Sequence, residues 1–314
     1  MTWQPSASLE SLKARAELNR YIREFFAVRD VLEVETPVLS QAGVSDPYLN
    51  PVVATCMGKP AYLHTSPEYP MKRLLASGSG DIYQICKVFR DDELGRRHNP
   101  EFSMLEYYRV DFSMMTLMDE VAQLVGDFLH IQQRLDLTYE QAMERYAGLN
   151  PFTADNAELL SKARECMGAD VDLDRDGCLD VLMTHMVEPN LPRETLVFIH
   201  AYPQSQAALA RIYEDKNGHA VSKRFELYVN GLELANGYDE LCDAEEQGQR
   251  FERDQAQQQA INGQVRPVDN HFLGALAHGM PACAGVALGL DRILMLKLGA
   301  ASIAEVLSFS YDLS

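Results

Sequence analysis

The sequence predicts a large unit of the α/β or α+β class, because it contains both helical and strand-like stretches. Residues 8–29 place leucine, isoleucine and phenylalanine at helical spacing with basic residues between them, which indicates an amphipathic helix. Residues 82–90 and 102–109 alternate in character, which predicts two strands joined by a charged loop. Asn230 and Gly231 are a type I′ turn signal between two further alternating runs, which predicts a hairpin.

We expect one continuous domain over residues 1–314, with a mostly helical insertion at about 115–220. A chain of 314 residues is long for a single domain but still within the range of one large unit. Residues 31–37 suggest a short strand that ends at a proline, and residues 244–262 a polar helix. Residues 284–290 suggest a glycine-rich strand that leads into a helix.

The composition is that of a soluble globular protein, with 46% hydrophobic and 24% charged residues. The balance of 28 basic against 46 acidic residues gives a net charge of −18, which repels phosphate backbones and argues against a nucleic-acid partner. No apolar run approaches the roughly 20 residues of a membrane span, and no signal peptide is recognised. We therefore expect a cytoplasmic protein with no membrane partner. Its cysteines include no CxxC pair and are expected to be reduced: Cys56, Cys86, Cys166, Cys178, Cys242 and Cys283.

One acidic motif imitates a calcium site. Asp172, Asp174, Asp176 and Gly177 match the start of an EF-hand loop, but Met183 stands where the bidentate glutamate belongs. Without that ligand, a solvated turn before a helix is the better interpretation.

Three separated segments indicate a chemistry when they are considered together. They are Glu35 to Pro37; Phe89 to Tyr108, which contains Arg90 and His98; and Gly285 to Arg292. In this order and at these separations they resemble motifs 1, 2 and 3 of class II aminoacyl-tRNA synthetases. Each motif alone is weak, but their joint occurrence makes coincidence very unlikely.

Within that class, the segments His98 to Tyr108 and Arg224 to Glu240 resemble lysyl-tRNA synthetases. The resemblance covers nearly the whole chain, from Leu9 to Ser310. Such synthetases also carry an N-terminal OB-fold that reads the anticodon, and we expect it to be absent here because the motif 1 helix begins within the first dozen residues. A shortened, acidic core of this kind is similar to the bacterial elongation factor P (R)-β-lysine ligases.

The resemblance implies a reaction in two steps. The carboxylate of (R)-β-lysine would attack the α-phosphorus of ATP, and the activated acyl group would then pass to a lysine side chain of elongation factor P. Arg90 would hold the α-phosphate and Arg292 the far phosphate, as catalytic residues, while Phe102 would stack under adenine and Gly289 would allow close approach of the nucleotide. The implied ATP-binding residues are Arg90, Asp91, Asp92, His98, Asn99, Phe102, Glu233, Leu234, Gly289 and Arg292.

The resemblance also implies a magnesium site and an amino-acid pocket. Glu226 and Glu233 match two carboxylates that carry Mg²⁺, since a hard cation prefers hard oxygen ligands. Acidic side chains in the pocket would neutralise the two ammonium groups of a diamino acid. The implied pocket residues are Ser66, Pro67, Glu68, Glu106, Tyr108, Asn236, Glu240 and Ala287. Asp92, Ser66 and Ala287 depart from the lysyl-tRNA synthetase pattern, which typically has glutamate, alanine and glycine there.

The resemblance implies an α+β fold, the class II synthetase catalytic core, with an antiparallel six-stranded sheet flanked by helices. It also implies a homodimer formed largely by the segment up to Pro37. Two other interpretations remain open. The first is a lysyl-tRNA synthetase core that acts on tRNA, and the second is a non-catalytic synthetase paralogue. Retention of Arg90, Glu226, Glu233 and Arg292 argues against the second, and the acidic balance argues against the first.

Overall fold

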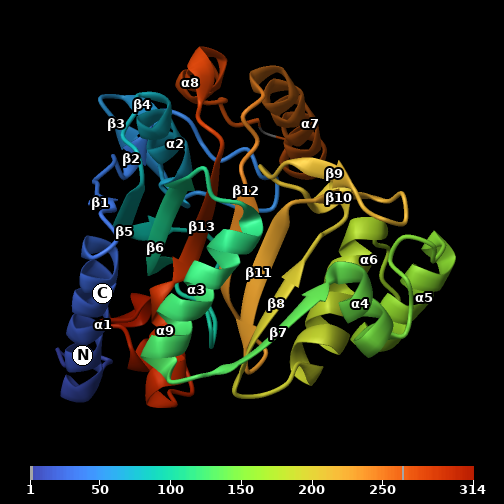
Figure 1. Cartoon of the computed structure of the whole chain (residues 1–314), viewed down its shortest axis with the longest axis horizontal. Helices are drawn as coiled ribbons and strands as arrows, with labels where there is room; N and C mark the ends of the chain where they lie inside the picture. Colours follow the sequence, from blue (N-terminus) through green and yellow to red (C-terminus); the bar gives the residue numbers. More distant parts are fainter. Residues whose placement is uncertain (1–2, 264) are drawn as a thin grey trace. The chain divides into compact units, whose positions relative to one another are not determined.

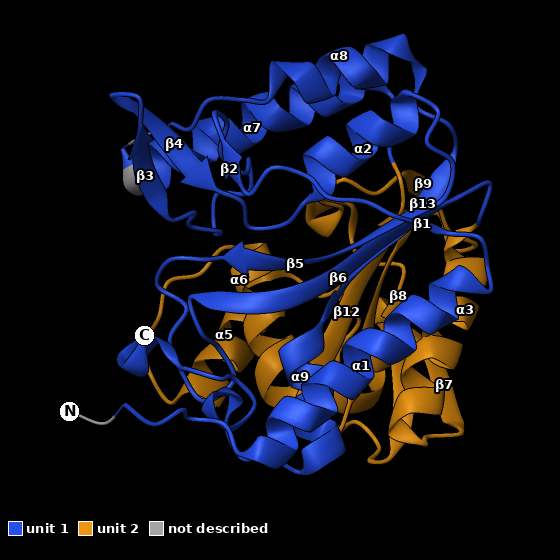
Figure 2. Ribbon diagram, turned by 90° about the vertical axis from the view of Figure 1, so that its left-hand side faces the viewer, with its two compact units in different colours: residues 1–112, 241–314 blue, residues 113–240 orange. Residues whose placement is uncertain are grey.

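The computed structural model describes residues 3–263 and 265–314, and the chain divides into two compact units (Figure 2). Unit 1 comprises Met1–Phe112 and Leu241–Ser314, and unit 2 comprises Ser113–Glu240. The expected domain over residues 1–314 stays a prediction, and its residues 1, 2 and 264 lie outside the described residues.

Unit 1 combines helices, four strands of the main sheet and a small three-stranded sheet (Figure 1). Its α-helices are α1 (Leu9–Ala27), α2 (Glu68–Ala76), α7 (Ala244–Asn262), α8 (Asn270–Gly279) and α9 (Leu290–Leu298). Its main-sheet strands are β1 (Leu32–Glu33), β5 (Ile82–Phe89), β6 (Glu101–Val110) and β13 (Cys283–Gly289). The small sheet contains β2 (Leu39–Ser40), β3 (Val53–Cys56) and β4 (Lys59–Leu63), and two 3₁₀ turns lie at Ile303–Glu305 and Tyr311–Leu313.

Helix α1 forms as its amphipathic pattern predicts. The Ser8 hydroxyl caps its first turn by accepting the Ser11 N–H at 3.1 Å. Its apolar side includes Phe26, which is fully buried and packs against the rings of Tyr83 and Tyr107, with centroids 4.5 and 4.9 Å away. These aromatic contacts fasten the helix to strands β5 and β6.

Strands β5 and β6 confirm the two strands predicted at residues 82–90 and 102–109, and they pair antiparallel. In the register of the central strands, Gln84 on β5 and Ala287 on β13 both lie opposite Glu106 on β6. Gln84 and Glu106 are 3% and 2% exposed. The sheet therefore places polar side chains inside unit 1, where each one needs a polar partner.

Unit 2 contains helices and strands in alternation. The helices are α3 (Met114–Leu129), α4 (Tyr139–Ala142), α5 (Asn156–Met167) and α6 (Arg175–Leu182), with π-helical turns at Met143–Ala147 and Met183–Val187 and 3₁₀ turns at Glu188–Asn190 and Gln204–Gln206. The strands are β7 (Gln133–Thr138), β8 (Thr195–His200), β9 (Ile212–Glu214), β10 (Ala220–Ser222), β11 (Arg224–Val229) and β12 (Leu232–Asp239).

The main sheet corrects the expected antiparallel six-stranded sheet. It has eight strands, to which unit 1 contributes β1-β5-β6-β13 and unit 2 contributes β12-β11-β8-β7 in sheet order. The ladders β5–β6, β6–β13, β11–β12 and β8–β11 are antiparallel, but β1 pairs with β5 and β7 with β8 in parallel. The two strands that pair in parallel, β1 and β7, are the edge strands of the sheet. The expected six-stranded sheet therefore lacked these two edge strands.

The expected helical stretch therefore also contains strands. Residues 133–138 lie in this stretch, but they form strand β7 because they pair with β8. Two local predictions are confirmed: Asn230 and Gly231 both have positive φ, 54° and 69°, as a type I′ turn requires. Asp174 caps α6 by accepting the Gly177 N–H at 2.8 Å, so the EF-hand-like run is a turn before a helix.

All six cysteine thiols are free, as expected. Among the described residues, no helix has both the length and the apolar composition that a membrane crossing needs.

Replacing Gly231 with alanine is expected to destabilise unit 2. The new Cβ would lie 2.7 Å from the Glu188 carbonyl oxygen, in addition to the cost of a positive φ. Gly168 also has positive φ but no atom within 4 Å of such a Cβ, so Gly168→Ala measures the backbone cost alone, about 1 kcal/mol. Urea unfolding should show a loss for Gly231→Ala that is larger by at least about 1 kcal/mol. Equal losses would contradict the steric account.

Candidate active site

The segment between β5 and β6 carries the predicted α-phosphate ligand. Arg90 directly follows β5, and its N–H donates to the Pro100 carbonyl at 2.9 Å, which closes the base of the loop. Its guanidinium lies 5.1 Å from the Phe102 ring centroid and 3.6 Å from a Glu93 carboxylate oxygen. The Nε of Arg90 is buried and has no hydrogen-bond partner among the described residues. A buried donor of this kind is suited to an anionic ligand.

The predicted far-phosphate ligand contacts the same loop. The Nη2 of Arg292, at the start of α9, lies 2.7 Å from His98 Nε2. Burial and the Arg292 charge lower the pKa of His98, so its ring is neutral at neutral pH and accepts this hydrogen bond. Unit 1 therefore brings His98 and Arg292 together although 194 residues separate them in sequence.

The other predicted nucleotide ligands in this loop have structural contacts. Asn99 is buried, where its amide donates to the Glu101 carbonyl at 2.7 Å and its oxygen accepts the Tyr311 N–H at 3.1 Å. Asp91 accepts the N–H of Asp92 at 3.0 Å, and Asp92 has a positive φ of 62°. These contacts shape the loop, and the contribution of the three side chains to ATP binding stays a prediction.

Gly289, the predicted close-approach glycine, has ordinary backbone angles. A Cβ at this position would meet only Arg292 side-chain carbons, at 3.8 and 3.9 Å, which is ordinary contact. Nothing in the described protein therefore requires a glycine here, so any requirement for it must come from a ligand.

The first half of the predicted amino-acid pocket lies where α2 begins. The Ser66 hydroxyl accepts the N–H of Glu68 at 3.0 Å, and Pro67 occupies the N-cap position between them. Glu68 stands in the first helical turn, where a negative charge is favoured by the helix dipole. Its Oε1 lies 2.7 Å from the ammonium of Lys72, a side chain with 0% exposure.

The second half lies on β6. Glu106 Oε1 accepts the hydroxyl of Tyr108 at 2.7 Å, whereas Oε2 is buried without a hydrogen-bond partner among the described residues. Burial, followed by the charge of Glu68, raises the pKa of Glu106 to about 8. Glu106 and Glu68 are thus close enough to interact, as expected for a pocket with two carboxylates, and Ala287 faces Glu106 from β13.

Both predicted metal ligands, Glu226 and Glu233, lie in unit 2. The Glu226 carboxylate accepts hydrogen bonds from three side chains. Its Oε1 accepts Arg224 Nη2 at 2.5 Å, and its Oε2 accepts the hydroxyls of Tyr202, at 2.5 Å, and Tyr228. Burial and the Glu226 charge raise the pKa of both tyrosines, so they remain donors. Since each carboxylate oxygen can accept two hydrogen bonds, only one position on Oε1 remains for a cation.

The remaining predicted residues of unit 2 follow the type I′ turn along β12. Glu233 is half-buried opposite Tyr228, and the next residue, Leu234, is 2% exposed. Asn236 lies opposite Glu226 and its oxygen accepts Arg224 Nε at 3.3 Å.

Glu240, directly after β12, is 1% exposed. Its main-chain oxygen accepts Arg211 Nε at 3.0 Å. The roles of these residues toward ligands stay predictions.

Sequence reasoning missed the basic and hydroxyl partners of the buried carboxylates: Lys72, Arg224, Tyr202, Tyr228 and Arg15. The spacing of Lys72 four residues after Glu68 on one helix was a usable signal. Arg15 donates to Asp291, which has 2% exposure, and Asp291 also accepts the Ser103 N–H at 2.6 Å. No sequence pattern indicates that pair, because its members are 276 residues apart.

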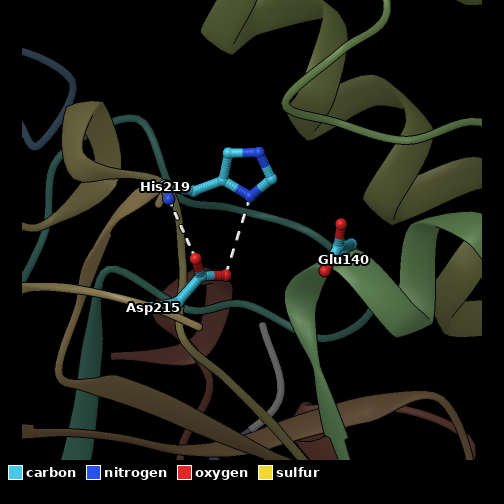
Figure 3. Close-up of side chains that lie close together, drawn as sticks. All are labelled: Glu140, Asp215 and His219. Atoms are coloured by element: carbon cyan, nitrogen blue, oxygen red, sulfur yellow. Dashed lines mark hydrogen bonds and ion pairs between the residues drawn. The ribbon is translucent and has the colours of Figure 1, made fainter. Parts of the chain in front are cut away.

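A further cluster lies in unit 2 apart from these residues. Glu140, Asp215 and His219 each place one potential ligand atom within 4.8 Å of the others, and Figure 3 shows the His219 ring nitrogen directed at Asp215. Asp215 Oδ1 already accepts the N–H groups of Asn217 and His219, and both Glu140 oxygens accept amides of Asn150 or Asn217. These hydrogen bonds stabilise the turn between β9 and β10, which explains why the three side chains lie close together.

Comparison with known proteins agrees with the motif assignment. Residues 1–312 match the family model for class II tRNA synthetases (D, K and N). A Salmonella arizonae protein named elongation factor P (R)-beta-lysine ligase is 48% identical over 320 aligned residues, covering 99% of this chain and 98% of that protein. A Pasteurella multocida protein of the same name is 47% identical over 317 residues, with the same coverage. These similarities therefore extend over almost the full length.

Replacing Asp291 with asparagine should destabilise the protein by about 2–3 kcal/mol, because a partly buried Arg15 loses its counterion. Glu24→Gln is the control, since Glu24 and its partner Arg20 are both 70% exposed and an exposed pair contributes less than about 1 kcal/mol. Chemical unfolding of both variants measures the difference. If the two substitutions cost the same, the Arg15 contact does not have the stabilising effect assigned to it.

Proposed function

The chain belongs to the family of class II tRNA synthetases (D, K and N), and on this basis we propose that it is an ATP-dependent ligase that attaches (R)-β-lysine to elongation factor P. The observation that carries the proposal is the 47–48% identity, over 99% of the chain, to proteins named for that activity. The pocket of unit 1 supports it, since two carboxylates, Glu68 and Glu106, suit a substrate with two ammonium groups.

In the first step, a carboxylate oxygen of (R)-β-lysine attacks the α-phosphorus of ATP and pyrophosphate leaves. Arg90 holds the α-phosphate, because a planar guanidinium with a buried, unsatisfied Nε donor stabilises the charge that develops on the phosphate oxygens. Arg292, whose hydrogen bond to neutral His98 fixes its direction, holds the far phosphate. Phe102 supports the adenine and the Arg90 guanidinium.

In the second step, the lysine amine of elongation factor P attacks the acyl carbon, AMP leaves and the amine loses a proton. Within the pocket, Glu106 Oε2 and Glu68 hold the ammonium groups, and Tyr108 orients the Glu106 carboxylate. These contacts orient the substrate carboxyl group for both steps.

Magnesium fits the donors of unit 2 in a limited way. The remaining acceptor position on Glu226 Oε1 and the half-buried Glu233 are hard oxygen ligands of the kind that Mg²⁺ prefers. When bound, the ion would neutralise phosphate charge. Arg224, Tyr202 and Tyr228 hold the Glu226 carboxylate in one orientation for it.

We place the protein in the cytoplasm as a homodimer formed largely by the segment up to Pro37, with elongation factor P as its protein substrate. The direct test is mass spectrometry of elongation factor P after incubation with the protein, ATP, Mg²⁺ and each lysine isomer. A mass increase of one lysyl group with (R)-β-lysine supports the proposal, and an unmodified factor overturns it.

The alternative, charging of tRNA, is disfavoured by the net charge of −18. We expect only weak tRNA binding at physiological salt and no lysyl-tRNA formation. A filter-binding titration and a charging assay with radioactive lysine check this expectation. Sub-micromolar tRNA binding accompanied by charging would favour the alternative.

Replacing Arg90 with alanine should lower ATP–pyrophosphate exchange about a hundredfold or more, with little change in stability, because the lost contact is to the reacting phosphate. Arg193→Ala, which removes an exposed arginine that the mechanism does not use, should leave exchange unchanged. Near-normal exchange by a well-folded Arg90→Ala variant would rule out the assigned role.

Replacing Ser66 with alanine and Ala287 with glycine should improve activation of α-lysine relative to (R)-β-lysine. The amino group of the β isomer is one carbon further from the carboxylate. We expect the Ser66 hydroxyl and the Ala287 methyl group to decide in which isomer this amino group finds a hydrogen-bond partner. One misplaced buried hydrogen bond costs roughly 1–3 kcal/mol, equivalent to about a tenfold to hundredfold change. Activation efficiencies for both isomers give the ratio. An unchanged ratio would place specificity at other residues.

A further inference from the structure

Lys72 has no assigned part in the reaction, yet it is one of the most deeply buried side chains of unit 1. It has 0% exposure on the inner side of α2, and its ammonium lies 2.7 Å from Glu68 Oε1. The same nitrogen lies 5.7 Å from the ring centroid of Phe272 on α8. Burial of an ammonium is costly unless the charge is paired, and the contact with Glu68 offsets this cost.

The position of this pair matters because Glu68 interacts with Glu106. Two carboxylates at one site repel each other, which favours the protonated form of one of them, and a nearby cation reduces that effect. Lys72 places such a cation beside Glu68. One Glu68 oxygen is thereby satisfied before any substrate arrives, whereas Glu106 keeps a buried Oε2 without a partner among the described residues.

We infer that Lys72 is a positioning residue of the amino-acid pocket, which fixes the Glu68 carboxylate and sets how readily Glu106 ionises to receive the substrate ammonium. The inference rests on the proposed function for the identity of that substrate. Lys72 acts through Glu68 and does not itself touch the reacting atoms.

The groups of unit 1 that face Glu106 come from four directions. On α2 and the turn before it they are Glu68, Lys72 and Ser66; on β5, Gln84 and Cys86; on β6, Tyr108; and on β13, the uncharged Ala287. Burial and then the Glu68 charge raise the pKa of Glu106 to about 8, and the hydroxyls of Tyr108 and Ser66 and the charge of Lys72 oppose that rise. Cys86 stays neutral, because burial raises its pKa to about 12.

Binding of a dication should depend on pH through Glu106. Below pH 8 this side chain is mostly protonated without substrate, and binding of an ammonium group requires loss of that proton. Affinity for a dication should therefore increase as the pH rises toward about 8 and level off above it. Removing the Lys72 charge should raise the pKa of Glu106 and move this midpoint upward, whereas removing the Glu68 charge should move it downward.

The experiment uses the full-length protein labelled with ¹³C at the glutamate carboxyl carbons and needs no substrate. The Glu106 signal is identified by its absence in Glu106→Gln, and its titration is compared in wild type, Lys72→Met and Glu68→Gln. We expect a midpoint near 8 in wild type, a higher midpoint in Lys72→Met and a lower one in Glu68→Gln. The matched control is Lys87→Met, which removes a 47% exposed lysine of β5 and should leave the midpoint unchanged.

A purely structural Lys72 would change unfolding but not the titration. An unchanged Glu106 midpoint in folded Lys72→Met, or an equal shift in Lys87→Met, overturns the inference. Should Lys72→Met fail to fold, Glu68→Gln decides, because an unchanged or higher midpoint there removes the link between α2 and Glu106.

The second arm measures the affinity for (R)-β-lysine between pH 6.5 and 9. Each unit by which the midpoint rises in Lys72→Met should weaken binding at pH 7 about tenfold, with a smaller effect at pH 9. A loss that is equal at both pH values overturns the inference. If wild type binds no lysine isomer while the carboxyl titrations shift as expected, the inference about Lys72 stands and the proposed substrate is wrong.

Discussion

The structure depends on one constraint, which is that a carboxylate inside a protein must have a cation or several hydrogen-bond donors beside it. Of three buried acids, two obey it in different ways. Asp291 has Arg15 and a main-chain N–H, and Glu226 has Arg224 and two tyrosine hydroxyls. Glu106 is the exception, because one of its oxygens has no partner among the described residues, and burial holds its pKa near 8. A buried acid with an unpaired oxygen is suited to a positively charged ligand.

The same constraint separates the predicted site residues into two kinds: those whose polar atoms are paired within the protein, and those with an unpaired polar atom that a ligand could contact. Asp291 and Glu226 have their partners before any ligand binds, so they fix the start of α9 and strand β11. Within unit 1, Arg90 has a buried hydrogen-bond donor, Nε, without a partner, and Glu106 has a buried acceptor, Oε2, without a partner. One suits an anion and the other a cation, as ATP and a diamino acid would require. When fixed side chains surround the groups that bind the substrate, little of the protein has to rearrange during the reaction.

The acidic residues behind the net charge of −18 are of two kinds, exposed and buried. Part of the acidic excess lies in surface pairs of little energetic weight, such as Arg20 with Glu24. Another part consists of the buried acids, whose chemistry is set by neighbours and not by the overall charge. The acidic balance therefore bears on encounter with phosphate backbones, while the site chemistry depends on a few local contacts.

The sequence by itself determined the elements whose signals are local: helix α1, the strand pair β5 and β6, the type I′ turn at Asn230 and Gly231, and the turn before α6. It also indicated the motif residues, since Arg90, His98 and Arg292 belong to recognisable runs. The sequence also predicted a short strand at residues 31–37, where β1 lies, but tertiary structure alone decided its parallel pairing with β5. It alone also decided the edge strand β7, because a short polar segment becomes a strand only when a neighbour pairs with it. It likewise decided the partners of Asp291 and Glu226, since pairs between distant residues leave no periodic pattern and arise only when the chain buries both groups together.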